Sequence, residues 1–286
     1  MALGCVLAVS VSVLSRVTDA PAKPQGPQLG DSRPGITEPG HGAQKTPAVA
    51  GSDGLAACEQ RLERTPRRVP VLAVVGASYT AGVGPGSPAL SWAVQLARML
   101  HWNAVIDGVP GAGYARAGAG SQGPVLRVLA REDLRALRPA LVIVQAGHDD
   151  IGVPLWAERR QVAQAIAFIR AAAPKAQIGL LTVFTAGPPS PSAVRTDHAI
   201  VSAAITADSR VIVMDPLTGR WTFQHSHRGL HPTAAGDAWI ARKLADILRS
   251  RGVPAAQGTS RPVTCDSGIS VLHGPGKPVP PRNPEA

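Results

Sequence analysis

The chain has 286 residues, of which 44% are hydrophobic, and this is enough to build a real core in one domain of ordinary size. Its formal net charge of +10 predicts a surface that attracts anions, a class that includes nucleic acids, acidic polysaccharides and anionic lipid headgroups. Aromatic residues make up only 3% of the chain and no basic run is interleaved with them, so a base-stacking surface and a nucleic-acid partner are not expected.

The two ends of the chain lack the pattern of a folded domain. Residues 2–14 form an apolar stretch that is too short to span a bilayer as a stable helix, and the small-residue pattern Thr18-Asp19-Ala20 follows it. This pattern predicts a signal peptide over residues 1–20, although no basic residue precedes the apolar stretch. Residues 21–57 are rich in Pro and Gly and predict a disordered linker, and residues 253–286 predict a Pro-rich tail.

Between residues 58 and 252, short apolar runs alternate with segments of helical spacing. The runs predicted as strands are 71–75, 103–107, 140–146, 178–184 and 210–215. The segments predicted as helices, in which apolar residues recur every three or four positions, are 91–100, 123–137, 158–173, 192–207 and 233–252. The alternation predicts an α/β domain of three layers, α/β/α, with a parallel sheet of about five strands in the middle.

Functional side chains of such sheets gather at the carboxyl ends of the strands, and the loops there carry residues with chemistry. The loops hold Ser78 in "GASYTAG", Gly111 in "GVPGAGYARAG", Asp149 and Asp150 in "GHDDIG", and His231 in "RGLHPTAAG". A serine hydroxyl becomes a nucleophile when a base removes its proton, and His231 is the candidate base in these loops.

Each of these residues also has a structural interpretation. Ser78 could cap a helix or belong to a phosphate-binding turn, and His231 could be a structural loop histidine. Gly111 could be present only because its backbone needs a positive φ angle. Asp149 and Asp150 could cap a helix or bind surface cations, and for Asp150 the structural interpretation is the preferred one.

Taken together, the four loops resemble the signature blocks of the GDSL, or SGNH, hydrolase family in the family's order, over roughly residues 69–250. The resemblance implies a flavodoxin-like fold and a serine esterase that needs no metal or other cofactor. It implies that Ser78 is the nucleophile and His231 the base. It also implies an oxyanion hole formed by the backbone N–H groups of Ser78 and Gly111 and by the side chain at position 149.

The sequence departs from the family pattern at the oxyanion hole, because Asp149 stands where the family has asparagine. An ionised carboxylate would repel the developing oxyanion. Asp149 could be protonated and donate, it could turn away, or His148 could supply the missing donor.

A second departure concerns the triad acid, because Arg228 stands three residues before His231, where the family usually has aspartate. Asp215, after the last predicted strand, is the nearest acidic candidate upstream; otherwise a backbone carbonyl could orient the imidazole and leave a Ser–His dyad. Arg228 could instead favour an anionic substrate.

Two cysteines flank the predicted domain, Cys58 before it and Cys265 after it. In an oxidising compartment they could form a disulfide that joins the two ends of the domain, and the alternative is two free thiols.

These observations predict an exported esterase or acyl hydrolase that acts on lipid esters or O-acylated glycans, with a possible association with the cell envelope. An O-acyltransferase would use the same acyl-enzyme. The alternative from another class is an envelope protein that keeps the fold and binds glycan or an anionic polymer without turnover, as the two departures and the basic surface would allow. The sequence leaves the acyl length, the alcohol and the oligomeric state open.

Overall fold

The computed structural model describes residues 50–64, 69–226, 229–256 and 262–266. These residues form a parallel sheet of six strands in the order β5-β4-β3-β1-β2-β6. The strands are β1 (Val71–Gly76), β2 (Asn103–Gly108), β3 (Leu141–Gln145), β4 (Gln177–Leu181), β5 (Ile212–Met214) and β6 (Thr264–Asp266). The α/β class and the parallel sheet are confirmed, with six strands in place of about five.

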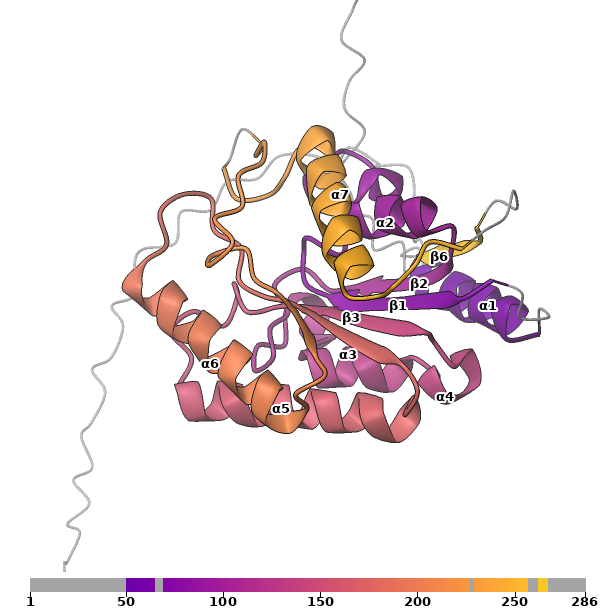
Figure 1. Cartoon of the computed structure of the whole chain (residues 1–286), viewed down its shortest axis with the longest axis horizontal. Coiled ribbons are helices and arrows are strands. Elements are labelled where there is room, and N and C mark those ends of the chain that lie inside the picture. The colour runs from indigo at the N-terminus through magenta and orange to yellow at the C-terminus, as the bar shows by residue number, and fades with distance from the viewer. Residues whose placement is uncertain (1–49, 65–68, 227–228, 257–261, 267–286) are drawn as a thin grey trace, which may run out of the picture. The chain divides into compact units, whose positions relative to one another are not determined.

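Helices cover both faces of the sheet (Figure 1). The helices are α1 (Ala50–Arg64), α2 (Trp92–Leu100), α3 (Val125–Arg131), α4 (Leu134–Leu137), α5 (Leu155–Ala172), α6 (Pro191–Ala207) and α7 (Ala234–Ser250), with short 3₁₀ turns at Pro88–Leu90 and Ala119–Ser121. Successive side chains of β1 point to opposite faces: Leu72 and Val74 pack with α2 and α7, whereas Ala73 and Val75 pack with α3, α5 and α6. The core therefore has two halves, one on each side of the sheet.

The segment predicted as one helix over residues 123–137 is two helices, α3 and α4. The Asp133 side chain accepts a hydrogen bond of 2.9 Å from the Ala136 N–H and so caps the start of α4. Aspartate favours this capping position because its carboxylate satisfies an N–H group that the first turn of a helix leaves unpaired. A new helix therefore starts within the apolar pattern.

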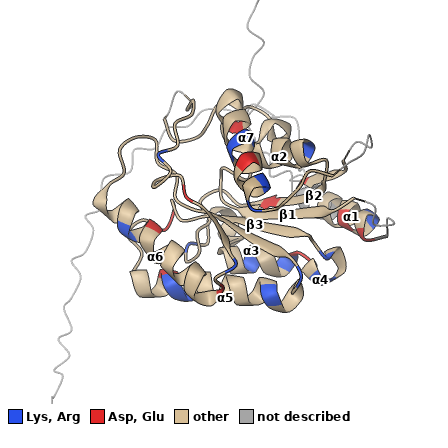
Figure 2. Ribbon diagram, in the orientation of Figure 1, with Lys and Arg blue, Asp and Glu red and all other residues tan. Residues whose placement is uncertain are grey.

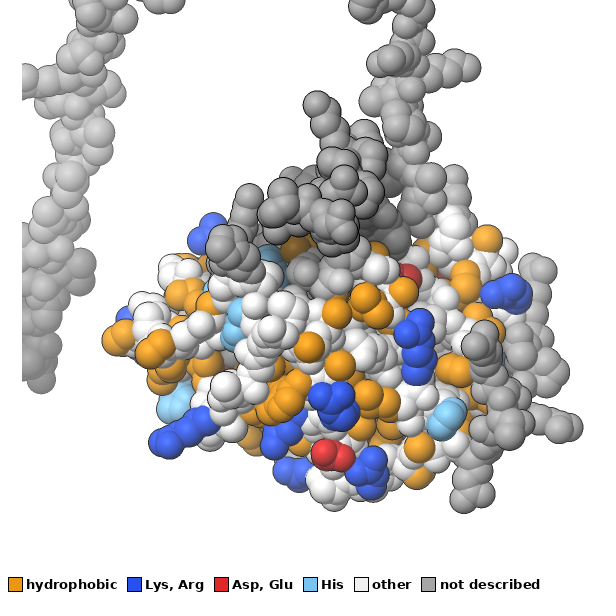
Figure 3. Space-filling model, turned by 90° about the horizontal axis from the view of Figure 1, so that it is seen from above, with side chains coloured by type: hydrophobic (Ala, Val, Ile, Leu, Met, Phe, Trp, Pro, Cys, Tyr) orange, Lys and Arg blue, Asp and Glu red, His pale blue; other side chains and the backbone are white. Residues whose placement is uncertain are grey.

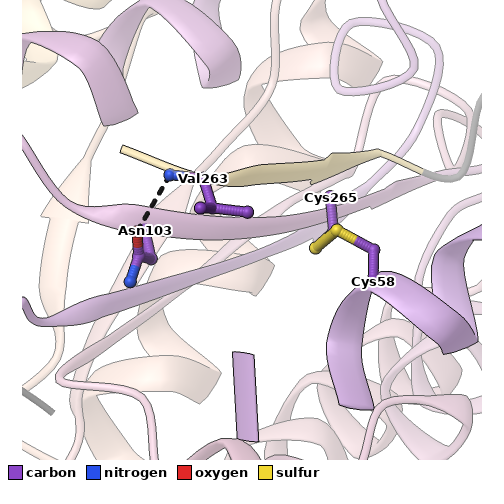
Figure 4. The surroundings of a disulfide bond; sticks show 4 residues. All are labelled: Cys58, Asn103, Val263 and Cys265. Atoms are coloured by element: carbon purple, nitrogen blue, oxygen red, sulfur yellow. Dashed lines mark hydrogen bonds between the residues drawn. A yellow bond between two sulfur atoms is a disulfide. The ribbon is translucent and has the colours of Figure 1, made fainter. Parts of the chain in front are cut away.

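Both segments predicted as linker and tail contribute to the fold. Helix α1 starts at Ala50, inside the predicted linker, and β6 pairs with β2 from inside the predicted tail. A disulfide between Cys58 of α1 and Cys265 of β6 joins them, with the two Cα atoms 5.7 Å apart (Figure 4). Beside it, the Val263 N–H donates a hydrogen bond of 2.9 Å to the Asn103 side chain of β2. The predicted signal peptide, residues 1–20, lies outside the described residues.

The charge of the chain is spread over the helices of both layers (Figure 2). On the face seen in Figure 3, basic side chains stand among hydrophobic and uncharged ones. No helix in the described part of the chain combines the length and the apolar character needed to cross a membrane.

A buried acid on α5 makes the stability of the fold depend on pH. Glu158 is 1% exposed, and neither of its carboxyl oxygens has a hydrogen-bond partner among the described residues. Burial, and then the charge of Asp150, raise its pKa to about 9. As the pH rises, Glu158 loses its proton in the unfolded chain at a lower pH than in the folded chain. Its contribution to the free energy of unfolding is therefore complete below the ordinary pKa of 4.5 and is lost as the pH rises towards 9.

We expect Glu158→Gln to flatten the dependence of stability on pH. The wild-type unfolding free energy should fall relative to that of the variant by about 1.4 kcal/mol per pH unit between roughly pH 5 and pH 8. Urea unfolding of both proteins at four pH values measures the difference. Parallel curves for the two proteins would mean that Glu158 ionises normally in the folded state.

Candidate active site

The loops that follow β1, β2 and β3, which were predicted to carry functional residues, lie together at the carboxyl ends of the strands. Strand β1 lies between β2 and β3, and the register pairs Gly76 with Gly108 of β2 and with Gln145 of β3, so the carboxyl ends of the three strands are level. After β1 the chain forms β2 on one side of it, and the next strands, β3, β4 and β5, lie on the other side. A parallel sheet has its crevice at such a change of direction, and Ser78 follows β1 there.

A buried glutamine fixes the turn that carries Ser78. Gln145 is 1% exposed, and its side-chain oxygen accepts hydrogen bonds from the N–H groups of Ala77 and Thr80, both at 3.2 Å, and from the Thr80 hydroxyl at 3.0 Å. A Cβ on Gly76 would lie 2.5 Å from the Gln145 carbonyl oxygen, so the turn folds back on β3 closely enough to require glycine. Sequence reasoning missed Gln145; its signal is a polar residue at the end of an apolar strand.

We expect Gln145→Leu to loosen this turn. The change keeps the size of the side chain but leaves the buried N–H and hydroxyl of Thr80 without an acceptor, which should lower the unfolding free energy by about 2–4 kcal/mol. The variant Gln177→Leu, at the exposed first position of β4, is the matched control and should change it by less than about 0.5 kcal/mol. Urea unfolding measures both values, and equal stabilities of the two variants would contradict the role of Gln145.

His231 lies beside Ser78 although 153 positions separate them in the sequence. Its Nε2 is 2.9 Å from the Ser78 Oγ, and both side chains are half-buried. The Ser226 N–H donates to the His231 carbonyl at 2.7 Å, and Thr233 caps α7, so the loop is held on both sides of His231. Gly84 also packs against it, because a Cβ there would lie 2.8 Å from the His231 Cβ.

The surroundings of His231 keep its imidazole neutral. Burial lowers its pKa from 6.5, and the charge of His148 lowers it further. A neutral imidazole has a lone pair on one ring nitrogen, and at Nε2 this lone pair can accept the hydrogen bond of the Ser78 hydroxyl. The pair can therefore transfer a proton from serine to histidine at neutral pH.

In the described part of the chain no hydrogen bond or ion pair joins Asp215, the acid suggested by the sequence, to His231. The Asp215 carboxylate accepts a hydrogen bond of 2.9 Å from the Thr218 N–H, and its charge acts on the carboxyl of Asp197 on α6. Burial, and then the charge of Asp215, raise the pKa of Asp197 to about 6. Among the described residues no carboxylate forms a hydrogen bond or ion pair with His231. Arg228 lies outside the described residues.

Two backbone N–H groups near the edge of the sheet are unpaired. Within the described part of the chain, neither the Ser78 N–H nor the Gly111 N–H donates a hydrogen bond to another residue. The Val109 N–H donates to the Gly76 carbonyl at 2.8 Å, which brings the loop after β2 alongside the end of β1. Gly111 has a φ of +77°, a conformation that favours glycine. Neither N–H group is therefore used by another residue within the described part of the fold.

Asp150 has the structural role that its sequence context favours. Its carboxylate is fully buried and accepts hydrogen bonds from the N–H groups of Tyr114, at 2.7 Å, and Ala115, at 3.0 Å. A Cβ on Gly113 would lie 2.2 Å from that carboxylate. Asp150 therefore ties the loop after β2 to the loop after β3, and so holds the backbone around Gly111.

His148 and Asp149 are half-buried in the loop after β3. His148 Nδ1 is 2.8 Å from the Phe184 carbonyl oxygen, which can only accept, so Nδ1 carries the hydrogen and Nε2 of the neutral ring is an acceptor. His148 could therefore donate to an oxyanion only as a cation. Burial raises the pKa of Asp149, and the charge of His148 opposes this rise.

Comparison with known proteins identifies similar sequences and folds. The family model of the GDSL-like lipase/acylhydrolase family matches residues 74–239 of the 286. A carbohydrate esterase of family 2 from Corynascus thermopiles is 18% identical, with a TM-score of 0.55 over 66% of this chain and 68% of that one. An acetyl xylan esterase from the rumen bacterium Butyrivibrio proteoclasticus is 16% identical, with a TM-score of 0.52 over 66% of each chain.

A further family 2 carbohydrate esterase, from Cellvibrio japonicus, is 16% identical, with a TM-score of 0.52 over 65% of this chain and 63% of that one. No curated protein matches the chain. At these identities the solved structures establish a likeness of fold alone.

Proposed function

Because the chain belongs to the GDSL-like lipase/acylhydrolase family, and is therefore an esterase or acylhydrolase, we propose that Ser78 is its nucleophile and His231 its general base. The observation that carries the proposal is the 2.9 Å separation between the Ser78 Oγ and the His231 Nε2. It lies at the carboxyl edge of the sheet, where the chemistry of such folds is found. These two residues supply both the nucleophile and the base that the proposed reaction requires.

The proposed reaction proceeds through an acyl-enzyme. The Ser78 Oγ attacks the ester carbonyl carbon while its proton passes to the His231 Nε2. The carbon–oxygen bond to the alcohol then breaks, and His231 returns the proton to the leaving oxygen, which departs as the free alcohol. Water attacks the acyl-enzyme in the same way: its proton passes to His231 and then to the Ser78 oxygen, and the carboxylic acid is released.

We place the negative oxygen of each tetrahedral intermediate between the Ser78 N–H and the Gly111 N–H. Both groups lack other partners among the described residues, which supports this assignment. We assign the third position to Asp149, whose carboxyl can donate only when it is neutral; burial raises its pKa, which favours that form. The proposed site is a Ser–His dyad with Asp149 as the third member of the oxyanion hole.

We infer that the substrate is the carboxylic ester of a glycan or lipid outside the cytoplasm. The disulfide between Cys58 and Cys265 supports an oxidising compartment, where such bonds persist. Three proteins with a similar fold are described as carbohydrate or acetyl xylan esterases, which favours an O-acylated glycan over a lipid ester.

A fluorophosphonate probe tests the proposed nucleophile directly. The full chain is incubated with the probe, digested and analysed by mass spectrometry, and the label should lie on Ser78. Hydrolysis of p-nitrophenyl acetate and release of acetate from acetylated xylan are measured in parallel. If the folded protein takes no label, releases no product and still binds glycan, the non-catalytic interpretation is correct.

A further inference from the structure

Tyr79 connects the loop of the proposed nucleophile to the loop of the proposed base. It follows Ser78 directly, and its side chain is 2% exposed. Its hydroxyl donates a hydrogen bond to the carbonyl oxygen of Leu230, the residue immediately before His231. Burial raises the pKa of Tyr79, so the hydroxyl keeps its proton and remains a donor. A single side chain thus bridges two segments about 150 positions apart in the sequence.

The ring of Tyr79 is held in place on two sides. It stacks on Phe184, with the ring centres 4.3 Å apart and the planes 3° from parallel. It also contacts the His231 imidazole, with the ring centres 5.5 Å apart and the planes inclined by 52°. Phe184 is fixed in turn, because it is 1% exposed and its carbonyl accepts the hydrogen bond of His148. The direction of the Tyr79 hydroxyl is therefore set by packing.

No acid among the described residues orients the proposed base through a hydrogen bond or ion pair. In a triad the acid fixes the tautomer and the angle of the imidazole through Nδ1. His231 has no carboxylate partner among the described residues, and the acidic candidate Asp215 accepts a hydrogen bond from the Thr218 N–H. His231 is contacted by its own loop, by Gly84, and by Ser78 and Tyr79 of the turn after β1. Of these residues, Tyr79 also donates a hydrogen bond to the loop of His231, from its hydroxyl to the Leu230 carbonyl.

We propose that Tyr79 is a positioning residue for His231. The Tyr79 hydroxyl binds the Leu230 carbonyl and so keeps the imidazole within proton-transfer distance of Ser78. The proposal rests on the proposed function in assigning the proton transfer, but the restraint on His231 is a property of the free protein. A displacement of about 1 Å in such a pair can lower turnover about 100-fold. We therefore expect loss of the hydrogen bond between Tyr79 and Leu230 to lower turnover more than it lowers the stability of the fold.

The two tyrosines of the chain provide a matched pair of variants. Tyr79→Phe removes the hydroxyl bound to Leu230 and keeps the ring. Tyr114→Phe removes a hydroxyl that is equally buried but has no hydrogen-bond partner among the described residues. We expect kcat for p-nitrophenyl acetate to fall about 10- to 100-fold in Tyr79→Phe with KM within about twofold of wild type, and Tyr114→Phe to match the wild type.

The pKa of His231, followed by NMR without substrate, is the readout that a purely structural role would not change. The resonance is assigned by its loss in His231→Gln. In the wild type, burial and the charge of His148 lower this pKa. In Tyr79→Phe the freed loop admits water, so the pKa should rise towards its ordinary value, and the acidic limb of kcat/KM should move to higher pH.

A second variant, Phe184→Leu, removes the ring on which Tyr79 stacks and leaves the hydroxyl in place. It should move kcat and the pKa of His231 in the same directions, by less, and it tests the proposal even if Tyr79→Phe fails to fold. Wild-type values of both quantities in folded Tyr79→Phe would overturn the proposal. If the wild-type protein hydrolyses no ester, the proposed function fails, and the NMR titration still decides the role of Tyr79.

Discussion

Replacing Ser78 by alanine should reduce kcat/KM for p-nitrophenyl acetate by at least about 10⁴-fold, as removal of the nucleophile does in other serine hydrolases. His231→Ala should cost about as much, because the hydroxyl 2.9 Å from Nε2 is a weak nucleophile without a base. The double variant should lose no more than either single variant, since two groups that act as one unit can be removed only once.

Controls separate this loss from damage to the fold. Ser87→Ala changes a serine in the same loop, at the start of the 3₁₀ turn, whose side chain makes no capping hydrogen bond, and it should keep full activity. Circular dichroism and urea unfolding of all variants should match the wild type. Activity of Ser78→Ala above about 1% of the wild-type value, or losses that multiply in the double variant, would contradict the proposed dyad.

Replacing Asp149 by asparagine should increase activity at alkaline pH. In the proposed site the Asp149 carboxyl donates to the oxyanion only while it is protonated, so activity falls as the pH rises through its pKa. The amide of asparagine donates at every pH. A donor in an oxyanion hole contributes about 10²- to 10³-fold to turnover, so the gain at pH 8 should be about 100-fold.

The pH dependence identifies the two groups. His231 must be neutral to accept a proton, so activity falls as the pH falls through its pKa, which burial and His148 lower. Burial raises the pKa of Asp149, while the charges of His148 and Arg116 lower it and that of Asp150 raises it. The wild type should therefore show a profile of kcat/KM with an acidic limb set by His231 and an alkaline limb set by Asp149. Asp149→Asn should retain the acidic limb and lose the alkaline one.

A surface aspartate serves as the control for this substitution. Asp246 on α7 is exposed, with an ion pair to Arg249, and Asp246→Asn should leave the profile unchanged. If Asp149→Asn retains the wild-type alkaline limb and rate, Asp149 faces away from the reacting oxygen and the oxyanion hole has only its two backbone donors.

The arrangement of helices and strands was predictable because burial imposes a pattern on the sequence. Runs such as that of β1 are apolar throughout because both faces of a parallel sheet are covered. Shorter elements were not predictable in this way. Strand β6 has only three residues, and it belongs to the sheet through its pairing with β2 and the disulfide at Cys265, neither of which leaves a periodic pattern.

Among the site residues, Ser78, Gly111 and Asp149 could be predicted as candidates because they follow strands, and His231 because it precedes the last helix, in the order of the family's signature blocks. Their partners could not. Asp215 is the nearest acid upstream in the sequence, but its distance along the chain carries no information on the direction of its side chain, which accepts a hydrogen bond from the Thr218 N–H. Gln145 and Tyr79 also escaped prediction, because a polar end of a strand and an aromatic in a turn have many uses.

The sequence by itself determined the fold class, the order of the loops and the residue types able to perform acyl transfer, because local apolar periodicity and short motifs are properties of neighbouring residues. Only the tertiary structure decided which of these groups meet. It placed His231 Nε2 2.9 Å from the Ser78 Oγ, joined the Asp215 carboxylate to the Thr218 N–H, and connected the two loops through the Tyr79 hydroxyl. Such contacts depend on packing between segments far apart in the chain, where a shift of one ångström separates a reactive pair from two unrelated side chains.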